Sequence, residues 1–191
     1  MICAGESIEN PITGERVTFL KTSAETDGES VLIDTTVAPN GFVAAEHLHP
    51  YQSERFEILR GEVEFKLDGE IAVAKAGDVV MVEPGTPHRF RNTGDEEIRF
   101  RCEVRPALTF ETFLETMFAL AAHGKTNNKG LPNPFHLAVI MEEHFDLVRL
   151  PFPPAWMQRT GLALGAPIGK LFGYEPTYLS VVEPERPDMV A

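Results

Sequence analysis

GFVAAEHLHPYQSERFEILRG, residues 41–61, is the stretch that decides the fold expected for this chain. Two of its histidines, His47 and His49, are separated by a single residue, and Glu54 follows a few positions later. Because successive side chains of a β-strand point to opposite faces, a strand over residues 43–49 would place both imidazoles on one face. The stretch therefore predicts β-structure that carries a cluster of polar ligands.

Short β-strands are predicted on both sides of this stretch, because apolar and β-branched runs alternate with turn residues throughout the first half of the chain. Residues 98–105 alternate most regularly, and Asp68-Gly69 is typical of a tight hairpin turn. The remaining strands are expected at residues 31–37, 43–49, 56–59, 63–67, 71–73 and 79–82. Many short strands joined by tight turns indicate a small sandwich or barrel.

The second half of the chain shows helical patterns instead. An apolar stripe predicts a helix over residues 110–121 with Thr109 as its N-cap, and Asn133-Pro134 predicts the start of another over 135–148. Residues 156–172 are apolar but interrupted by glycine and proline; they are interpreted as packing on the barrel or on a second subunit, with a membrane-surface segment as the alternative. We therefore expect a β-domain at residues 1–105, followed by a helical extension at residues 106–191.

Composition excludes several classes of protein. The chain carries 17 lysines and arginines against 29 aspartates and glutamates, a net charge of −12 that repels nucleic-acid phosphates and anionic membranes. Only two cysteines occur, so a disulfide framework or a cysteine-based zinc site is not expected. Neither a signal peptide nor a transmembrane run is evident, and a cytoplasmic location is the expectation.

A third histidine of the β half, His88, lies directly after the turn formed by residues 84–87. Together with His47, His49 and Glu54 it offers three imidazoles and one carboxylate, a ligand set that suits one divalent first-row metal: Fe, Mn, Ni, Co, Cu or Zn. Four protein ligands on a six-coordinate ion leave two positions for water, substrate or O2. A tetrahedral zinc with the same ligands would be closed and structural.

The spacing of these residues resembles the two motifs of the cupin superfamily. The first matches as Gly41-x5-His47-x-His49-x4-Glu54-x6-Gly61, and the second as Gly77-x7-Gly85-x2-His88-x3-Asn92. One departure occurs, because the proline usual in the second motif is replaced by Glu83 and follows at Pro84. The resemblance covers about residues 25–105 and leaves the helical extension outside it.

The resemblance implies a jelly-roll β-barrel in which His47, His49, Glu54 and His88 take the metal-ligand positions. Asn92 matches the motif, but a turn or backbone hydrogen-bonding role is the preferred interpretation. Relatives with this ligand set include dioxygenases, isomerases, lyases and decarboxylases, so the fold and the metal do not name the reaction. Cupins commonly dimerise, and the apolar helical faces need covering, so a homodimer is expected.

The leading hypothesis is a metal-dependent enzyme that acts on a small organic acid or phenol, with dioxygenase chemistry favoured because a histidine-rich site with open positions suits Fe(II) and O2. A non-catalytic module that binds a small molecule or senses a metal is the alternative, and a metal-free or zinc-bound scaffold is the third. No additional acid or base is identified, and catalytic residues stay unassigned. The other histidines are assigned to surface or packing roles: His123, His136 and His144.

Overall fold

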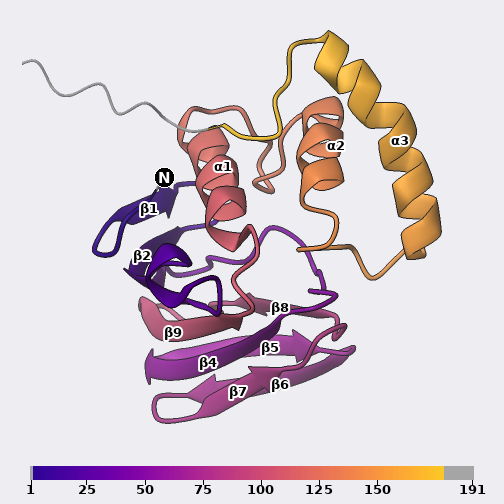
Figure 1. The fold of residues 1–191 in the computed structure, drawn as a ribbon. Helices are drawn as coiled ribbons and strands as arrows, with labels where there is room; N and C mark the ends of the chain where they lie inside the picture. Colours follow the sequence, from indigo (N-terminus) through magenta and orange to yellow (C-terminus); the bar gives the residue numbers. More distant parts are fainter. Residues whose placement is uncertain (1, 179–191) are drawn as a thin grey trace, which may run out of the picture.

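The computed structural model describes residues 2–178, so the end of the predicted helical extension lies outside the described part of the chain. Nine strands come first and three helices follow them, which confirms the mainly β fold with helices at the C-terminal side (Figure 1). The strands are β1 Ser7–Asn10, β2 Glu15–Lys21, β3 Val31–Val37, β4 Ser53–Arg60, β5 Glu62–Leu67, β6 Glu70–Lys75, β7 Val79–Val82, β8 His88–Arg91 and β9 Ile98–Arg105. The helices are the 3-10 turn η1 Ala24–Thr26, then α1 Phe110–Ala122, α2 Pro134–Glu143 and α3 Ala155–Leu171.

Two antiparallel sheets form the β-domain. The larger has the order β1-β2-β3-β9-β4-β7, and the smaller has the order β6-β5-β8. Strand β9 lies at the centre of the larger sheet, where Cys102 pairs with Ile33 of β3 on one side and Phe56 of β4 on the other. Chain neighbours are thus split between sheets, as expected for the predicted jelly-roll type.

The core fills the space between the two sheets. The predicted inward face of residues 98–105 is confirmed, because Ile98, Phe100, Cys102 and Val104 are all buried. Aromatic rings from both sheets meet there edge-on, with centroids 5.1 Å apart for Phe90 and Phe100. Such contacts stabilise the packing beyond the burial of their area alone.

Strands β1 and β2 were not among the predicted strands. Along β2 only Val17 and Phe19 are fully buried, and they are separated by polar residues. This alternation is the period of a half-buried strand, but the density of apolar residues is low. Strand β2 is stabilised by its backbone hydrogen bonds to β3, and the local sequence does not predict this pairing.

The helix ends differ from the predictions in two respects. Asn133 caps α2 as expected, accepting a hydrogen bond from the backbone N–H of Phe135 at 2.9 Å. Thr109 is the N-cap residue of α1 as predicted, but its side chain makes no capping hydrogen bond, since its hydroxyl lies 2.8 Å from Nδ1 of His144. Helix α2 ends at Glu143, and the predicted continuation through residues 145–148 is a buried irregular segment. The apolar residues of this segment pack into the core instead of forming the apolar face of a helix.

Helix α3 is continuous although its sequence is interrupted by glycines and a proline. Gly169 lies against α2, where an added Cβ would be 2.4 Å from the carbonyl oxygen of Phe135 and 2.6 Å from Cγ2 of Val139. The glycine therefore permits close helix packing, and Pro167 is accommodated near the C-terminal end of the helix. By contrast, Gly161 of the same helix has open space around it.

We expect Gly169→Ala to destabilise the protein and Gly161→Ala to stabilise it. The first change forces the helices apart and should cost about 1–3 kcal/mol, as overpacking does. The second should contribute up to about 1 kcal/mol through helix propensity. Thermal melts of both variants against the original chain measure the difference, and equal effects of the two changes would contradict this packing.

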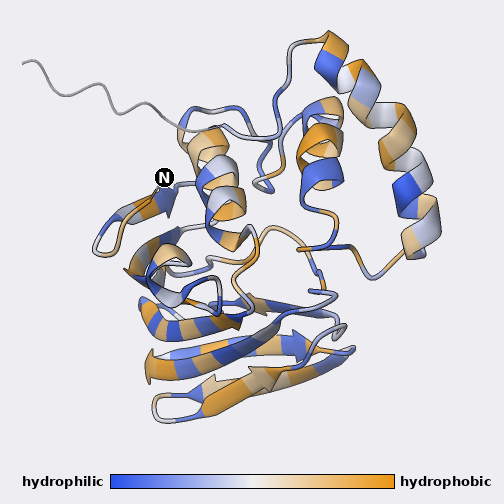
Figure 2. Ribbon diagram, viewed as in Figure 1, coloured by the Kyte–Doolittle hydropathy of each residue, from blue (hydrophilic) through white to orange (hydrophobic). Residues whose placement is uncertain are grey.

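Helix α3 contains apolar residues along its length (Figure 2), and several of their side chains are exposed among the described residues. Trp156 is 69% exposed, Leu164 69%, Leu171 87% and Phe172 67%. These side chains would suit either a second subunit or a membrane surface. The homodimer, the membrane-surface alternative and the cytoplasmic location therefore stay predictions.

Candidate metal centre

The three histidines of the β-domain meet at one place. His47 and His49 lie in the segment between β3 and β4, and His88 begins β8. Their ligating nitrogen atoms all lie within 4.8 Å of one another. His47 and His88 are also joined by two backbone hydrogen bonds, 3.0 Å from His47 N to His88 O and 2.7 Å in the reverse direction. The convergence expected of these imidazoles is confirmed.

The strand predicted over residues 43–49 is wrong, although both imidazoles still converge. Its backbone forms isolated bridges instead, with His47 bonded to His88 and Leu48 bonded to Arg149. The segment is therefore held between β8 on one side and the helical extension on the other. Instead of pairing regularly with one neighbouring strand, this segment makes backbone hydrogen bonds to His88 and to Arg149, which are far apart in the sequence.

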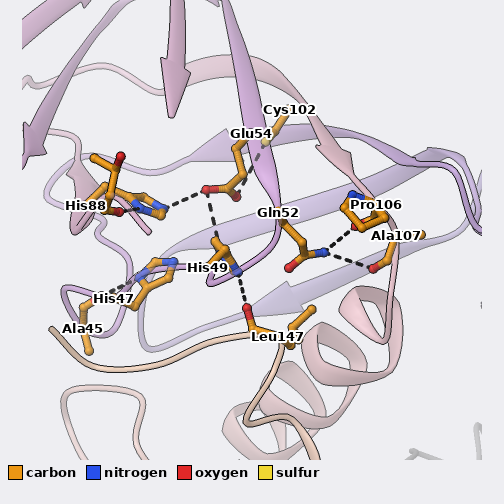
Figure 3. Close-up of polar contacts among 11 residues, drawn as sticks. Ala45, His47, His49, Gln52, Glu54, His88, Cys102, Pro106, Ala107 and Leu147 are labelled. Atoms are coloured by element: carbon orange, nitrogen blue, oxygen red, sulfur yellow. Dashed lines mark hydrogen bonds and ion pairs between the residues drawn. The ribbon is translucent and has the colours of Figure 1, made fainter. Parts of the chain in front are cut away.

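The Nδ1 atom of each histidine faces a backbone carbonyl oxygen (Figure 3). The acceptors are Ala45 for His47 at 2.9 Å, Leu147 for His49 at 2.7 Å, and Thr86 for His88 at 3.0 Å. Donation of the Nδ1 proton to a carbonyl fixes the ring and leaves Nε2 available as a ligand. All three imidazoles are thus oriented for binding through Nε2.

Glu54 of β4 joins the three rings. Its Oε2 atom lies 2.7 Å from Nε2 of His88 and 3.7 Å from Nε2 of His49 (Figure 3). Its Oε1 atom lies 4.0 Å from the thiol sulfur of Cys102, which is buried as predicted. The carboxylate itself is only 5% exposed, so it interacts with these groups rather than with water.

Burial and charge shift the acidity of these groups in different directions. Burial lowers the pKa of His47 to about 3, and the charges of His88 and His49 add to the effect. Burial alone would raise the pKa of Glu54, but His49 and His88 lower it to about 2. Burial likewise lowers the pKa of His88, yet its hydrogen bond and ion pair with Glu54 outweigh this and raise it. The interaction with Glu54 therefore favours the protonated form of His88 in the metal-free site.

The chemistry of the donor set fits a metal ion. Three Nε2 atoms and one carboxylate oxygen converge. In a neutral ring whose Nδ1–H donates a hydrogen bond to a carbonyl oxygen, Nε2 has a free electron pair for a metal ion. Such a buried cluster needs a cation among its members, which can be a proton or a metal ion. Imidazoles with a carboxylate suit first-row transition metals.

The cluster lies in the wall of a cavity of about 510 Å³. Residues from the barrel strands and from all three helices line this cavity, and most of them are apolar. The principal apolar residues are Val17, Ile33, Phe56, Phe90, Phe100, Phe110, Phe113, Leu114, Met117, Phe118, Leu137, Met141 and Leu162. The helices lie above the barrel (Figure 1), and their side chains form part of the cavity wall.

The other candidate residues lie away from the metal ligands. Asn92 donates to the carbonyl oxygens of Val37 and Ala38 at 3.0 Å, so its predicted backbone-bonding role is confirmed. His136 stacks on Tyr174 and His144 is buried in packing, as expected for histidines outside the site.

Two contributors to the site were missed by sequence reasoning. One is the carbonyl oxygen of Leu147, which orients His49 across 98 positions of the chain and leaves no signal in residue types. The other is Glu15 of β2, a carboxyl-bearing residue in the wall of the same cavity. Its signal was the alternation of Glu15, Val17 and Phe19, which puts the glutamate on the buried face.

Within residues 2–178, no helix combines the length and apolar character that crossing a membrane requires. A comparison with known protein families matches residues 33–104 to the cupin domain. This match covers the metal-site residues and most of the two sheets, but not the helices.

Several known proteins are similar to this chain. "Protein SchB" from Streptomyces halstedii is 31% identical over 93 residues, covering 49% of this chain and 67% of that protein. "Polyketide synthase CurC" from Streptomyces cyaneus is 40% identical over 62 residues, which is 32% of this chain and only 40% of that protein. "Oxidoreductase iacF" from Pestalotiopsis fici is 27% identical over 161 residues, covering 76% of this chain and 79% of that protein. An alignment that covers 76% of this chain is longer than the β-domain of residues 1–105, so the likeness to this last protein extends into the helical region.

Among solved structures, a predicted oxalate decarboxylase from Thermotoga maritima is 26% identical, with a TM-score of 0.48 over 53% of this chain and 90% of that one. Both cupin motifs and the matched cupin domain agree with the sheet arrangement described above. The chain belongs to the cupin superfamily.

Proposed function

We propose that this chain is a metal-dependent cupin enzyme that acts on a small, largely apolar molecule, with His47, His49, Glu54 and His88 as its metal ligands. One observation carries the proposal: three imidazoles and a carboxylate converge in the wall of a mostly apolar cavity of about 510 Å³. A purely structural metal would not need a cavity beside it.

The lining of the cavity indicates the kind of substrate. Its aromatic and aliphatic walls suit a ring-containing molecule, and its volume falls within the usual range for small-molecule sites, roughly 300–1,000 Å³. The names of two relatives, an oxidoreductase and a polyketide synthase, are consistent with redox chemistry on such a compound. We therefore favour a dioxygenase-like reaction on a phenolic substrate.

A bound first-row metal would supply Lewis acidity and a place for a substrate oxygen or O2. The chain's own residues prepare the site for it. The carbonyl oxygens of Ala45, Thr86 and Leu147 orient the rings, and Glu54 contributes a negative charge that offsets that of the cation. The helices contribute apolar side chains to the cavity wall, and the cavity leaves room for an apolar ring.

A non-catalytic binding or sensing role is the second candidate, and one contact favours it. His49 bonds to Leu147, and Leu48 bonds to Arg149, so the metal site is coupled directly to the helical extension. A ligand that moved His49 would therefore move the helices. Turnover distinguishes the two roles.

The test is oxygen consumption by protein loaded anaerobically with Fe(II) and mixed with a panel of phenols. We expect uptake with at least one phenol, and we expect Glu54→Gln to lower its rate by about tenfold or more through weakened binding of a hard cation. Glu64→Gln, a change at a glutamate that is ion-paired to Arg91 on the barrel exterior, is the matched control and should retain the rate. Ligand binding without uptake for any metal would favour the non-catalytic role.

A further inference from the structure

The wall of the cavity contains a second group of polar side chains, apart from the proposed metal ligands. Glu15 of β2 and Thr35 of β3 both belong to its wall, among apolar neighbours such as Val17 and Ile33. Neither residue has a role in the proposed metal site. Polar groups in an otherwise apolar wall are the features that fix the orientation of a ligand.

The side chain of Glu15 points into the barrel. Along β2 the residues alternate, so that Glu15 shares its face with Val17 and Phe19, which are 2% and 0% exposed. Its partner across the sheet is Val37, which is also 0% exposed. Glu15 therefore lies on the inward face of β2, where it is half-buried in the cavity wall.

No cationic side chain among residues 2–178 compensates this carboxyl group. Burial raises the pKa of Glu15 to about 7, and a hydrogen bond from the side chain of Thr13 opposes this shift but leaves the carboxyl group with further acceptor capacity. A carboxyl group in such surroundings is costly to bury unless it finds a hydrogen-bonding partner. The structure thus leaves Glu15 able to bind a polar group of a ligand.

Thr35 provides an independent sign of a missing partner. The residue is 2% exposed, and its hydroxyl oxygen has no hydrogen-bond partner among the described residues. Thr35 pairs with Val17 across the sheet, so it lies diagonally next to Glu15 on the same face. Buried hydroxyl groups are hydrogen-bonded in the great majority of proteins, so an unpartnered one in a cavity wall points to a ligand.

We propose that Glu15 and Thr35 form a second polar subsite, which binds a hydroxyl group of a ring-containing ligand whose remaining surface packs on the apolar wall. A hydroxyl group can donate to Glu15 and accept from Thr35, whereas a ligand carboxylate would be repelled above the pKa of Glu15, about 7. The inference rests on the proposed function, since the ligand must enter the same cavity. It narrows the substrate class to hydroxylated ring compounds and disfavours small organic acids.

A pair of isosteric probes tests the subsite: 2-naphthol and 2-methylnaphthalene, which differ only in a hydroxyl or methyl group. Dissociation constants are measured by probe fluorescence with the full-length, metal-loaded chain. We expect 2-naphthol to bind about tenfold more tightly than 2-methylnaphthalene, as one hydrogen bond to a carboxylate allows. In Glu15→Leu this preference should be lost or reversed, because the hydroxyl would then be buried without a partner.

Two further variants and a control keep the test decisive. Glu15→Gln preserves the shape of the side chain if the leucine variant folds poorly, and Thr35→Val should reduce the preference in part. Glu9→Gln changes an exposed glutamate of β1 that is ion-paired to Arg16, and it should leave the preference unchanged.

The outcomes separate the two proposals. An unchanged preference for 2-naphthol in both Glu15 variants would overturn the subsite while leaving the metal-dependent function intact. If neither probe bound the original chain, the cavity would not be a ligand site, and the proposed function would fail together with the subsite. Loss of the preference only in the Glu15 and Thr35 variants would support the subsite.

Discussion

His88→Ala should reduce bound divalent metal from about one ion per chain to less than about a tenth, because it removes one of three imidazoles that converge within 4.8 Å. It also removes the group that lies 2.7 Å from the buried carboxylate of Glu54. Elemental analysis after anaerobic purification measures the occupancy. Circular dichroism of the same samples shows whether the β-fold is retained.

Two other histidine variants complete this experiment. His47→Ala removes an imidazole without taking away the nearest partner of Glu54, so it tests the site if His88→Ala does not fold. His123→Ala, at an exposed position after α1, is the matched control and should keep its metal. Stoichiometric metal in both His47→Ala and His88→Ala would remove these residues from the proposed ligand set.

Metal affinity should fall as the pH is lowered through the pKa of His88. Its interaction with Glu54 raises that pKa above the usual 6.5, so in the metal-free protein His88 holds a proton that a metal ion must displace. His47 and Glu54, whose pKa values are about 3 and 2, are already deprotonated in this range. Competition by one proton weakens binding about tenfold for each pH unit below the pKa of His88.

Calorimetric titration with Zn²⁺ between pH 8 and about pH 5.5 measures this effect, and buffers with different ionisation enthalpies count the released protons. The His123→Ala control should give the same slope as the original chain. Affinity that did not change over this range, with no proton released on binding, would rule out His88 as a ligand that titrates with Glu54.

The helical extension is more closely tied to the site than a separate appendage would be. Leu48 and Arg149 exchange two backbone hydrogen bonds of 2.9 Å, and the neighbouring Leu147 carbonyl orients His49. Residues from all three helices also line the cavity. Substitutions in residues 145–150 should therefore be treated as changes to the metal site itself.

The sequence predicted which residues come together at the site, but not the backbone conformation of the segment that carries His47 and His49. The spacing of His47, His49, Glu54 and His88 predicted side chains that lie close together in the structure, because a motif records which residue types must converge. The strand expected over residues 43–49 was wrong, since the bonds of that segment go to residues about 40 and about 100 positions away. Local alternation carries no information about such distant partners.

Alternation and turn residues were sufficient to determine the β-rich fold, the inward face of β9 and the helical character of the second half, because these depend on short-range periodicity. Tertiary structure alone decided three other features: the lining of the cavity by the helices, the orientation of His49 by Leu147, and the lack of a hydrogen-bond partner for the buried Thr35 hydroxyl among the described residues. Each of these arises where segments distant in sequence come together around a shared space. The free energy of a polar group there depends on its neighbours in space rather than on its neighbours in the chain.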